Sequence, residues 1–210
     1  MVTARTRPNA GGDATRVALI DAAERLYAER GLEGVSLREI GVAAGQRKSN
    51  VAQYHFGDRD GLVQAIVLSR STTHNDHRNR LLAQSRPDGG GLAEALVEPL
   101  AADLGRGGDY VRFLFQLLVA SAGQLPFTPD LDPAATESFR DLLRRLRAAK
   151  PHLDPLVLQA RAELAVDFTV MALADRAVAE AADPPARLAR KRFVAEIVRA
   201  TAGILGTPAP

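Results

Sequence analysis

Apolar residues recur along most of the chain at the three- and four-residue spacings of an α-helix. The first such segment is predicted over residues 13–30, and Gly31 after it can end the helix in a left-handed conformation. Its inner face would carry Leu19, Ile20, Ala23, Leu26 and Tyr27. No segment keeps the alternation of apolar and polar residues that marks a half-buried strand, so the chain is predicted to be all-α.

Two short helices are predicted directly after the first one. Ser36 and Glu39 have the spacing of a capping box, in which each side chain bonds the backbone N–H of the other residue, so one helix should begin at Ser36. Gly45 interrupts the pattern, and the next helix should run to about Tyr54. Two short helices joined by a turn that contains Gly are typical of a helix-turn-helix unit that binds DNA.

The rest of the chain is predicted to form a larger helical domain. A long helix should run from Gly57 to about Gln84, and the Gly- and Pro-rich residues 86–91 are typical of a loop. Further helices, separated by Gly or Pro, are predicted over residues 92–104, 109–122, 133–149, 154–181 and 185–205. The expected organisation is a flexible arm at residues 1–12, a three-helix helix-turn-helix domain at 13–60 and a helical domain at 61–210.

Composition narrows the class of protein. The 210 residues include no Cys, which excludes disulfides and thiolate metal sites and agrees with a reducing, cytoplasmic location. No stretch of about 20 uninterrupted apolar residues is present to span a membrane, and no apolar segment typical of a secretory signal follows the N-terminus. The net charge of +2 produces only a weak overall field, so any binding of nucleic acid would depend on locally placed residues.

Candidate DNA contacts gather around the second short helix. This helix and the residues just before it carry side chains that can donate hydrogen bonds, and none of these side chains is acidic. Arg and Lys match guanine edges and phosphates, Asn and Gln match adenine, and the helix N-terminus at Ser36 favours phosphate. The same residues would also suit a polar face that contacts only water. The candidates are Ser36, Arg38, Gln46, Arg47, Lys48, Ser49, Asn50, Gln53, Tyr54 and His55.

Several short motifs follow one another between residues 13 and 66. They are the helix that ends in Tyr27 and Gly31, then Val35-Ser36-Leu37-Arg38-Glu39-Ile40, Ala44-Gly45, Tyr54-His55-Phe56 and Leu62. In this order and spacing they resemble the N-terminal domain of TetR-family repressors. The resemblance implies that residues 61–210 bind a ligand and form a dimer, and that Arg59 contacts a phosphate, because the family usually places a Lys there.

The chain departs from the commonest pattern of that family at two places. Ten residues, rather than nine, separate Gly45 from Phe56, which shifts the start of the recognition helix. Gln53 stands where the family often has an aromatic residue that touches phosphate. The side chains that enter the DNA groove are therefore not fixed by the resemblance alone.

The last two predicted helices carry more apolar surface than one subunit readily covers. A helix that is apolar on several sides must be buried on all of them, either inside the chain or against a partner. The resemblance implies a homodimer in which these helices form a four-helix bundle. The residues expected at the dimer interface are Phe193, Val194, Ile197, Val198, Thr201, Ile204 and Leu205.

Residues 109–122 are also apolar on all sides, apart from Arg112 and Gln116 four residues apart. Ligand pockets are mainly apolar and contain a few polar groups, and the resemblance implies a pocket lined by helices at this point. The residues expected to line it are Phe113, Phe115, Gln116, Phe168 and Met171. Packing inside an ordinary core would use the same residues.

The expected function is that of a ligand-responsive regulator of transcription. It would repress as a dimer on a palindromic operator and be released by a small, hydrophobic effector. A sequence-nonspecific architectural DNA-binding protein is an alternative, and an all-helical enzyme is a weaker one. No phosphate-binding loop, GxGxxG, GxSxG or HExxH motif occurs. His74 and His77 fit a solvated helix end better than a metal site, so we expect no catalytic residue, metal or cofactor.

Overall fold

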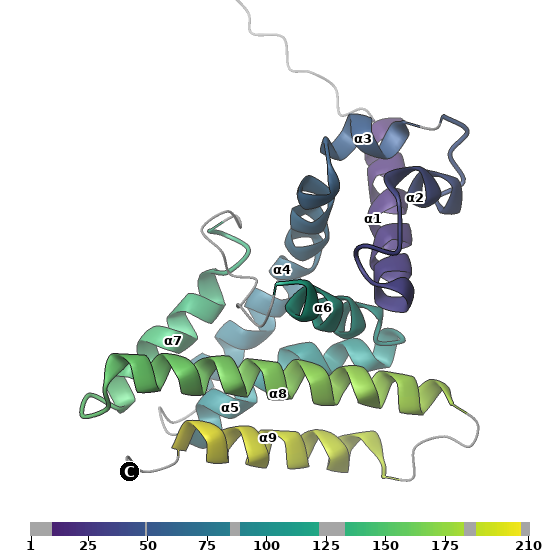
Figure 1. Ribbon diagram of the computed structural model, residues 1–210. Helices are drawn as coiled ribbons and strands as arrows, with labels where there is room; N and C mark the ends of the chain where they lie inside the picture. The colour runs from purple at the N-terminus through teal and green to yellow at the C-terminus, as the bar shows by residue number, and fades with distance from the viewer. Residues whose placement is uncertain (1–9, 49, 85–88, 122–132, 183–187, 207–210) are drawn as a thin grey trace, which may run out of the picture.

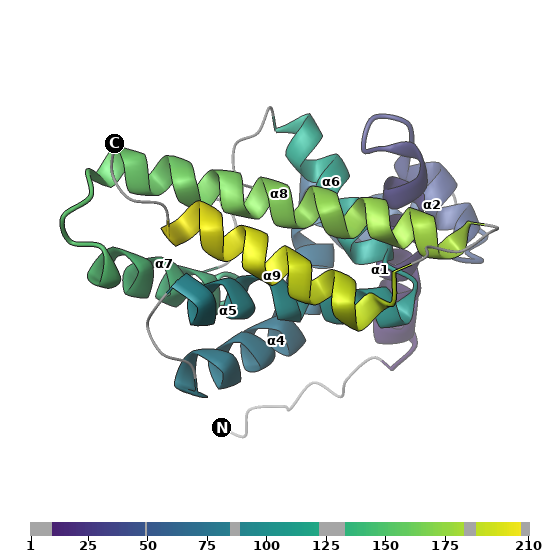
Figure 2. The same cartoon turned by 90° about the horizontal axis from the view of Figure 1, so that it is seen from below.

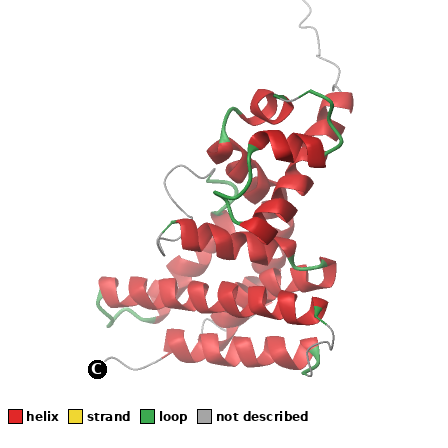
Figure 3. Cartoon of the chain, turned by 45° about the vertical axis from the view of Figure 1, so that its right-hand side comes forward, coloured by secondary structure: helices red, strands yellow, loops and turns green. Residues whose placement is uncertain are grey.

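The computed structural model describes residues 10–48, 50–84, 89–121, 133–182 and 188–206. Within these ranges the protein consists of helices and connecting turns, and no strand occurs among them (Figure 3). The prediction of an all-α fold is confirmed. None of the helices in the described part is both long and apolar enough to cross a membrane.

The first three helices are α1 (Ala10–Arg30), α2 (Leu37–Ala43) and α3 (Val51–Phe56). Helix α1 begins three residues earlier than predicted, so its first turn includes two glycines. The first N–H groups of a helix have no partner inside it, and Asp13 in this turn complements the helix dipole, which favours the earlier start. Residues 1–9 of the predicted arm lie outside the described residues.

The sequence predicts a turn at Gly45 but not the residue at which α3 begins. Gly45, with φ of 71°, turns the chain after α2, and α3 begins only at Val51. Helices α2 and α3 approach closely at Gly41, where a Cβ atom would lie 3.2 Å from Cγ1 of Val51. Four of the polar candidates, Gln46, Arg47, Lys48 and Asn50, therefore lie in the turn, and α3 itself has only six residues.

Seven further elements follow. They are α4 (Arg59–Gln84), α5 (Gly89–Ala101), the 3₁₀ helix η1 (Ala102–Arg106), α6 (Asp109–Ala120), α7 (Glu137–Ala149), α8 (Pro155–Ala181) and α9 (Arg190–Gly206). The loop predicted over residues 86–91 extends too far, because residues 89–91 form the start of α5. Gly89 faces α9, where an added Cβ would be in ordinary van der Waals contact with the Ala202 carbonyl oxygen at 3.5 Å, so α5 begins here in spite of the low helix propensity of Gly.

We refer to α1–α3 as the head and to α4–α9 as the body. Helix α4 runs from the head into the body, and α8 and α9 lie side by side along the end of the body remote from the head (Figures 1 and 2). Helix α6 packs against α1 on one side and against α8 on the other, and α5 packs against α4 and α9. Helix α6 is therefore the main contact of the body with the head.

Candidate DNA-binding surface and ligand cavity

The capping box predicted at the start of α2 is present. The Ser36 side chain accepts a hydrogen bond from the Glu39 N–H at 3.2 Å, and the Ser36 N–H donates to Oε2 of Glu39 at 2.9 Å. Arg30 at the end of α1 donates to Oε1 of Glu39 at 2.7 Å. Arg30 and then Ser36 lower the pKa of Glu39 to about 2. Glu39 therefore remains ionised, and it fastens α2 to α1.

Most of the candidate DNA-binding side chains are exposed on one end of the head. Tyr54 is 84% exposed and does not pack inside the domain. Gln46 is half-buried and donates to the Ala44 carbonyl oxygen at 3.2 Å. His55 and Arg59 are also half-buried, and Ser49 lies outside the described residues. The exposed candidates are Ser36, Arg38, Arg47, Lys48, Asn50, Gln53 and Tyr54.

The basic side chains of this surface differ in whether a carboxylate already pairs with them. Arg38, Arg47 and Lys48 form no ion pair with any described residue. Arg59, in contrast, pairs with Glu33, so a phosphate would have to compete with that carboxylate. No acidic residue occurs between positions 40 and 57. The turn before α3 is therefore a local positive surface in a chain that has little net charge.

Aromatic packing holds α3 in place beneath this surface. Phe56 is half-buried against the core, and the Arg16 guanidinium of α1 lies 5.3 Å from its ring centroid. His55 lies between Tyr54 and Phe56, at centroid distances of 5.3 and 6.1 Å. The half-buried Phe56 holds α3 against Arg16 of α1, while the Tyr54 ring is exposed.

Residues 19–66, which span α1, α2, α3 and the start of α4, match the family model of the tetR family of bacterial regulatory proteins. The protein carries a DNA-binding domain of the tetR family. It is therefore a DNA-binding regulator of transcription, and its matched segment contains the whole polar surface described above. A comparison with curated proteins finds no match to this chain.

Solved structures assigned to this family align with most of the chain, at TM-scores below 0.5. A protein of Mesorhizobium loti assigned to this family aligns over 96% of both chains with 20% identity and a TM-score of 0.49. A TetR-family regulator of Streptomyces coelicolor aligns over 96% of this chain and 99% of its own, with 22% identity and a TM-score of 0.47. The family assignment depends on the N-terminal match.

The body contains a cavity of about 70 Å³ between α4, α5, α6, α7 and α8. None of the five residues predicted to line a pocket lines this cavity. Helix α6 contributes Tyr110, Leu114 and Leu118, which follow one another at four-residue spacing, and α8 contributes Val166 and Val170. The prediction named the right helices and the wrong faces, because each step of one residue turns a side chain by about 100° around the helix.

The five residues predicted to line the pocket lie elsewhere in the structure. Phe113 is fully buried and stacks on Tyr27 of α1, with 6.3 Å between ring centroids. Gln116 lies beside Gly31, where an added Cβ would be 3.3 Å from its Oε1. Met171 is 48% exposed on the outside of α8. Phe115 and Phe168 are half-buried against the core.

The predicted dimer stripe of α9 also requires correction. Val194, Ile197, Thr201 and Leu205 are buried inside the protomer, where α9 packs on α5 and α8. The Thr201 hydroxyl lies 3.2 Å from that of Thr169 on α8. These four side chains are core residues of one subunit, because a stripe that faces inward shows the same periodicity as one that faces a partner. Phe193, Val198 and Ile204 are half-buried.

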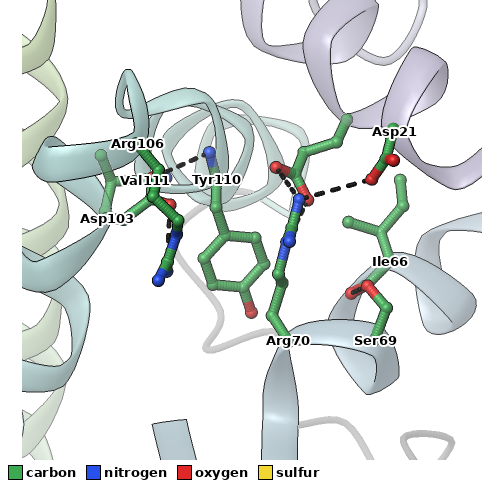
Figure 4. Close-up of polar contacts among 9 residues, drawn as sticks. Asp21, Ile66, Ser69, Arg70, Asp103, Arg106, Tyr110 and Val111 are labelled. Atoms are coloured by element: carbon green, nitrogen blue, oxygen red, sulfur yellow. Dashed lines mark hydrogen bonds and ion pairs between the residues drawn. The ribbon is translucent and has the colours of Figure 1, made fainter. Parts of the chain in front are cut away.

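Ion pairs join the head of the regulator to its body (Figure 4). Arg70 of α4 donates twice to Glu24 of α1, at 2.8 Å in both bonds, and lies 3.6 Å from Asp21. Burial raises the pKa of Glu24 in spite of this partner. Asp103 of η1 accepts from the backbone N–H of Tyr110 at 3.1 Å and so holds the start of α6. The ion pairs thus connect α1 of the head to α4, while the Asp103 hydrogen bond stabilises the start of α6 within the body.

His74 and Arg78 of α4 line the cavity and are each only 6% exposed. The expectation of a solvated polar helix end at this point was wrong, because this face of α4 packs against α5 and α6. Burial first, and then Arg78, Arg106 and Arg70, lower the pKa of His74 to about 3. The described residues contain no cluster of three His, Asp or Glu side chains able to hold a metal ion.

Acid is expected to destabilise the protein through His74. The pKa of about 3 in the folded state lies below the usual value of 6.5, so the unfolded chain binds more protons between these limits. The free energy of unfolding should therefore decrease as the pH falls below 6.5, by about 2 kcal/mol at pH 5. Urea unfolding at several pH values, with His74→Gln and the exposed His152→Gln compared, measures this. An unchanged pH dependence in His74→Gln would refute it.

Proposed function

We propose that this TetR-family regulator is a dimeric repressor that binds a palindromic operator and is released by a small effector. The observation that carries the proposal is the polar surface before and along α3, where Arg47 and Lys48 are exposed and unpaired among the described residues. Exposed cations without a carboxylate partner are available to phosphates and base edges. Such a surface, inside a TetR-family domain, is best explained by contact with operator DNA.

The candidate residues fall into two groups by position. Arg47, Lys48 and Asn50 precede α3, and the first residues of a recognition helix are those that reach base edges in the major groove. Ser36 at the N-terminus of α2 and the exposed Tyr54 are placed at the edges of this surface, where we assign them to phosphates. The first group would determine sequence preference and the second the position of the head on the duplex.

A row of exposed apolar side chains on α8 supports the dimer. Val157, Leu164, Met171 and Val178 are seven residues apart, and each is at least 38% exposed. Apolar residues repeating every seven positions form the contact seam of paired helices. We call these four residues the α8 seam. We propose that the seam meets its copy in a second subunit, together with the outer face of α9, and that the two heads then bind two operator half-sites.

The two faces of α6 support a response to ligand. Tyr110, Leu114 and Leu118 line the cavity, whereas Phe113 packs on Tyr27 in the head. The rings of Tyr110 and Phe113 are themselves in contact, with 6.0 Å between centroids. A ligand that displaces α6 from inside the cavity would therefore displace α1 as well. We propose that this shift changes the spacing of the two heads and releases the operator.

The proposal is tested by measuring operator binding of Arg47→Ala. We expect its affinity for DNA flanking its own gene to be about 10- to 100-fold lower than that of the wild type, because one phosphate or base contact is lost. Fluorescence anisotropy of labelled DNA, at two salt concentrations and with unrelated competitor DNA, gives the affinity. Arg147→Ala is the matched control, since Arg147 is exposed on α7 in the body.

Tight binding that resists competitor and is lost only in Arg47→Ala would support a sequence-reading head. Equal affinity of Arg47→Ala and the wild type for every DNA would contradict the role of the turn before α3. Equal affinity of the wild type for operator and competitor, also in DNA selected from random sequence, would favour the architectural alternative.

A further inference from the structure

The cavity in the body has one polar side, which α4 forms. Ser71, His74, Asn75 and Arg78 line it at spacings of three and four residues, so they lie on one face of the helix. The opposite walls, from α5, α6, α7 and α8, are almost entirely apolar, and none of the lining residues is acidic. The cavity therefore offers donor groups and a positive charge at one end and hydrocarbon at the other.

Arg78 provides the positive charge. Its Nε donates to the Ala95 carbonyl oxygen and its Nη1 to the Ser138 hydroxyl, both at 2.9 Å. Its guanidinium also lies 5.9 Å from the centroid of the Phe139 ring. All three partners are neutral, and no carboxylate among the described residues forms an ion pair with Arg78. A guanidinium that is 6% exposed thus lacks an anion.

Two other arginines show that this fold normally supplies a carboxylate. Arg70, which is partly buried, pairs with Glu24 at 2.8 Å. Arg176, as buried as Arg78, pairs with Glu180 at 2.7 Å. Burying a charge without a partner is unfavourable, so the missing anion at Arg78 is an exception that needs an explanation.

His74 adds a second unsatisfied group at the same place. Its Nε2 is buried and has no hydrogen-bond partner among the described residues. The imidazole packs on Tyr110, with 5.0 Å between ring centroids, so its orientation is fixed. A neutral imidazole carries a proton on one of its two nitrogens and can donate it. The cavity therefore presents a buried donor beside the unpaired guanidinium.

We propose that this cavity binds a small organic monoanion, whose carboxylate accepts hydrogen bonds from Arg78 and His74 while a short apolar tail lies against Leu114, Leu118 and Val166. A volume of about 70 Å³ admits roughly five to seven non-hydrogen atoms, since one water needs about 10–15 Å³. A short-chain carboxylate of the size of butyrate fits this volume. The role of the anion as effector rests on the proposed function, whereas the site itself does not.

Calorimetry with butyrate and its neutral isostere butyramide tests the site. We expect the wild type to bind butyrate about 10- to 100-fold more tightly than butyramide, because a hydrogen bond to a charged group is lost in the amide. Arg78→Met should remove this preference and remain folded, since it replaces an unpaired buried charge by an apolar side chain of similar length. Arg80→Met, on the exposed side of the same helix, should keep the preference, and thermal melting verifies that both variants fold.

Three results would overturn the proposal. They are equal binding of butyrate and butyramide, a butyrate preference that survives in Arg78→Met, and displacement of butyrate by inorganic phosphate or chloride at equal concentration. Operator anisotropy on the same samples separates the two hypotheses. Butyrate binding without any change in operator affinity refutes the effector role and leaves the site standing. A protein that binds butyrate but no operator refutes the proposed function alone.

Discussion

Leu164→Glu is expected to convert the protein into monomers and to reduce operator affinity by more than about 100-fold. Leu164 lies in the middle of the α8 seam, so in a two-fold dimer the substitution places two carboxylates in one apolar contact. In the proposed dimer, operator binding would depend on two linked heads, and the loss of such linkage costs between about 10² and 10⁴ in affinity. Sedimentation velocity gives the oligomeric state, and anisotropy gives the affinity.

Val119→Glu is the matched control for this variant. Val119 is 62% exposed on α6, close to the 60% of Leu164, and lies away from the seam. Both substitutions affect exposed side chains, so the circular dichroism spectrum of each variant should equal that of the wild type. A dimeric Leu164→Glu with normal operator binding would show that subunits meet elsewhere.

The largest loss of stability is expected for Phe113→Ala, at about 3–5 kcal/mol. Phe113 is fully buried between the head and the body, and its ring is in contact with those of Tyr27 and Tyr110. Its truncation leaves a cavity at the place where α6 supports α1. Urea unfolding at one fixed protein concentration measures the effect, because a dimer is stabilised by concentration.

Phe115→Ala provides the comparison on the same helix. Phe115 is half-buried, so its truncation should cost clearly less than that of Phe113. If the two variants lose equal stability, Phe113 has no special role between the head and the body. If Phe113→Ala also weakens the effect of ligand on operator affinity, the contact of α6 with α1 transmits the response.

The head could be predicted from the sequence because its signals are local. The Ser36–Glu39 capping box and the left-handed Gly31 each depend on a few adjacent residues, and both are present. The start of α3 could not be predicted, because the chain has one residue more than the common family pattern between Gly45 and Phe56. In the structure α3 starts at Val51.

The body could be predicted only to the level of its helices. Helix α6 is apolar on every side, so periodicity cannot decide which face meets the head and which meets the cavity. The polar face of α4 was also mispredicted. The polar character of His74 and Arg78 predicts exposure to solvent, but both residues are buried in the fold. The α8 seam was visible as a seven-residue repeat, and that signal could have replaced the α9 stripe.

Helix α4 would connect the geometry of the cavity to the operator in the proposed ligand response. It carries Arg78 in the cavity wall and Arg59 beside the head, 19 residues apart, which corresponds to about 29 Å of rigid helix. A tilt of roughly 5° about the Arg78 end moves the other end by about 2.5 Å over this length. In a symmetric dimer the two displacements add to about 5 Å, against a half-site spacing of about 34 Å. In the proposed dimer the helix would act as a lever arm, so that a small tilt at the cavity would become a misfit of the two heads on DNA.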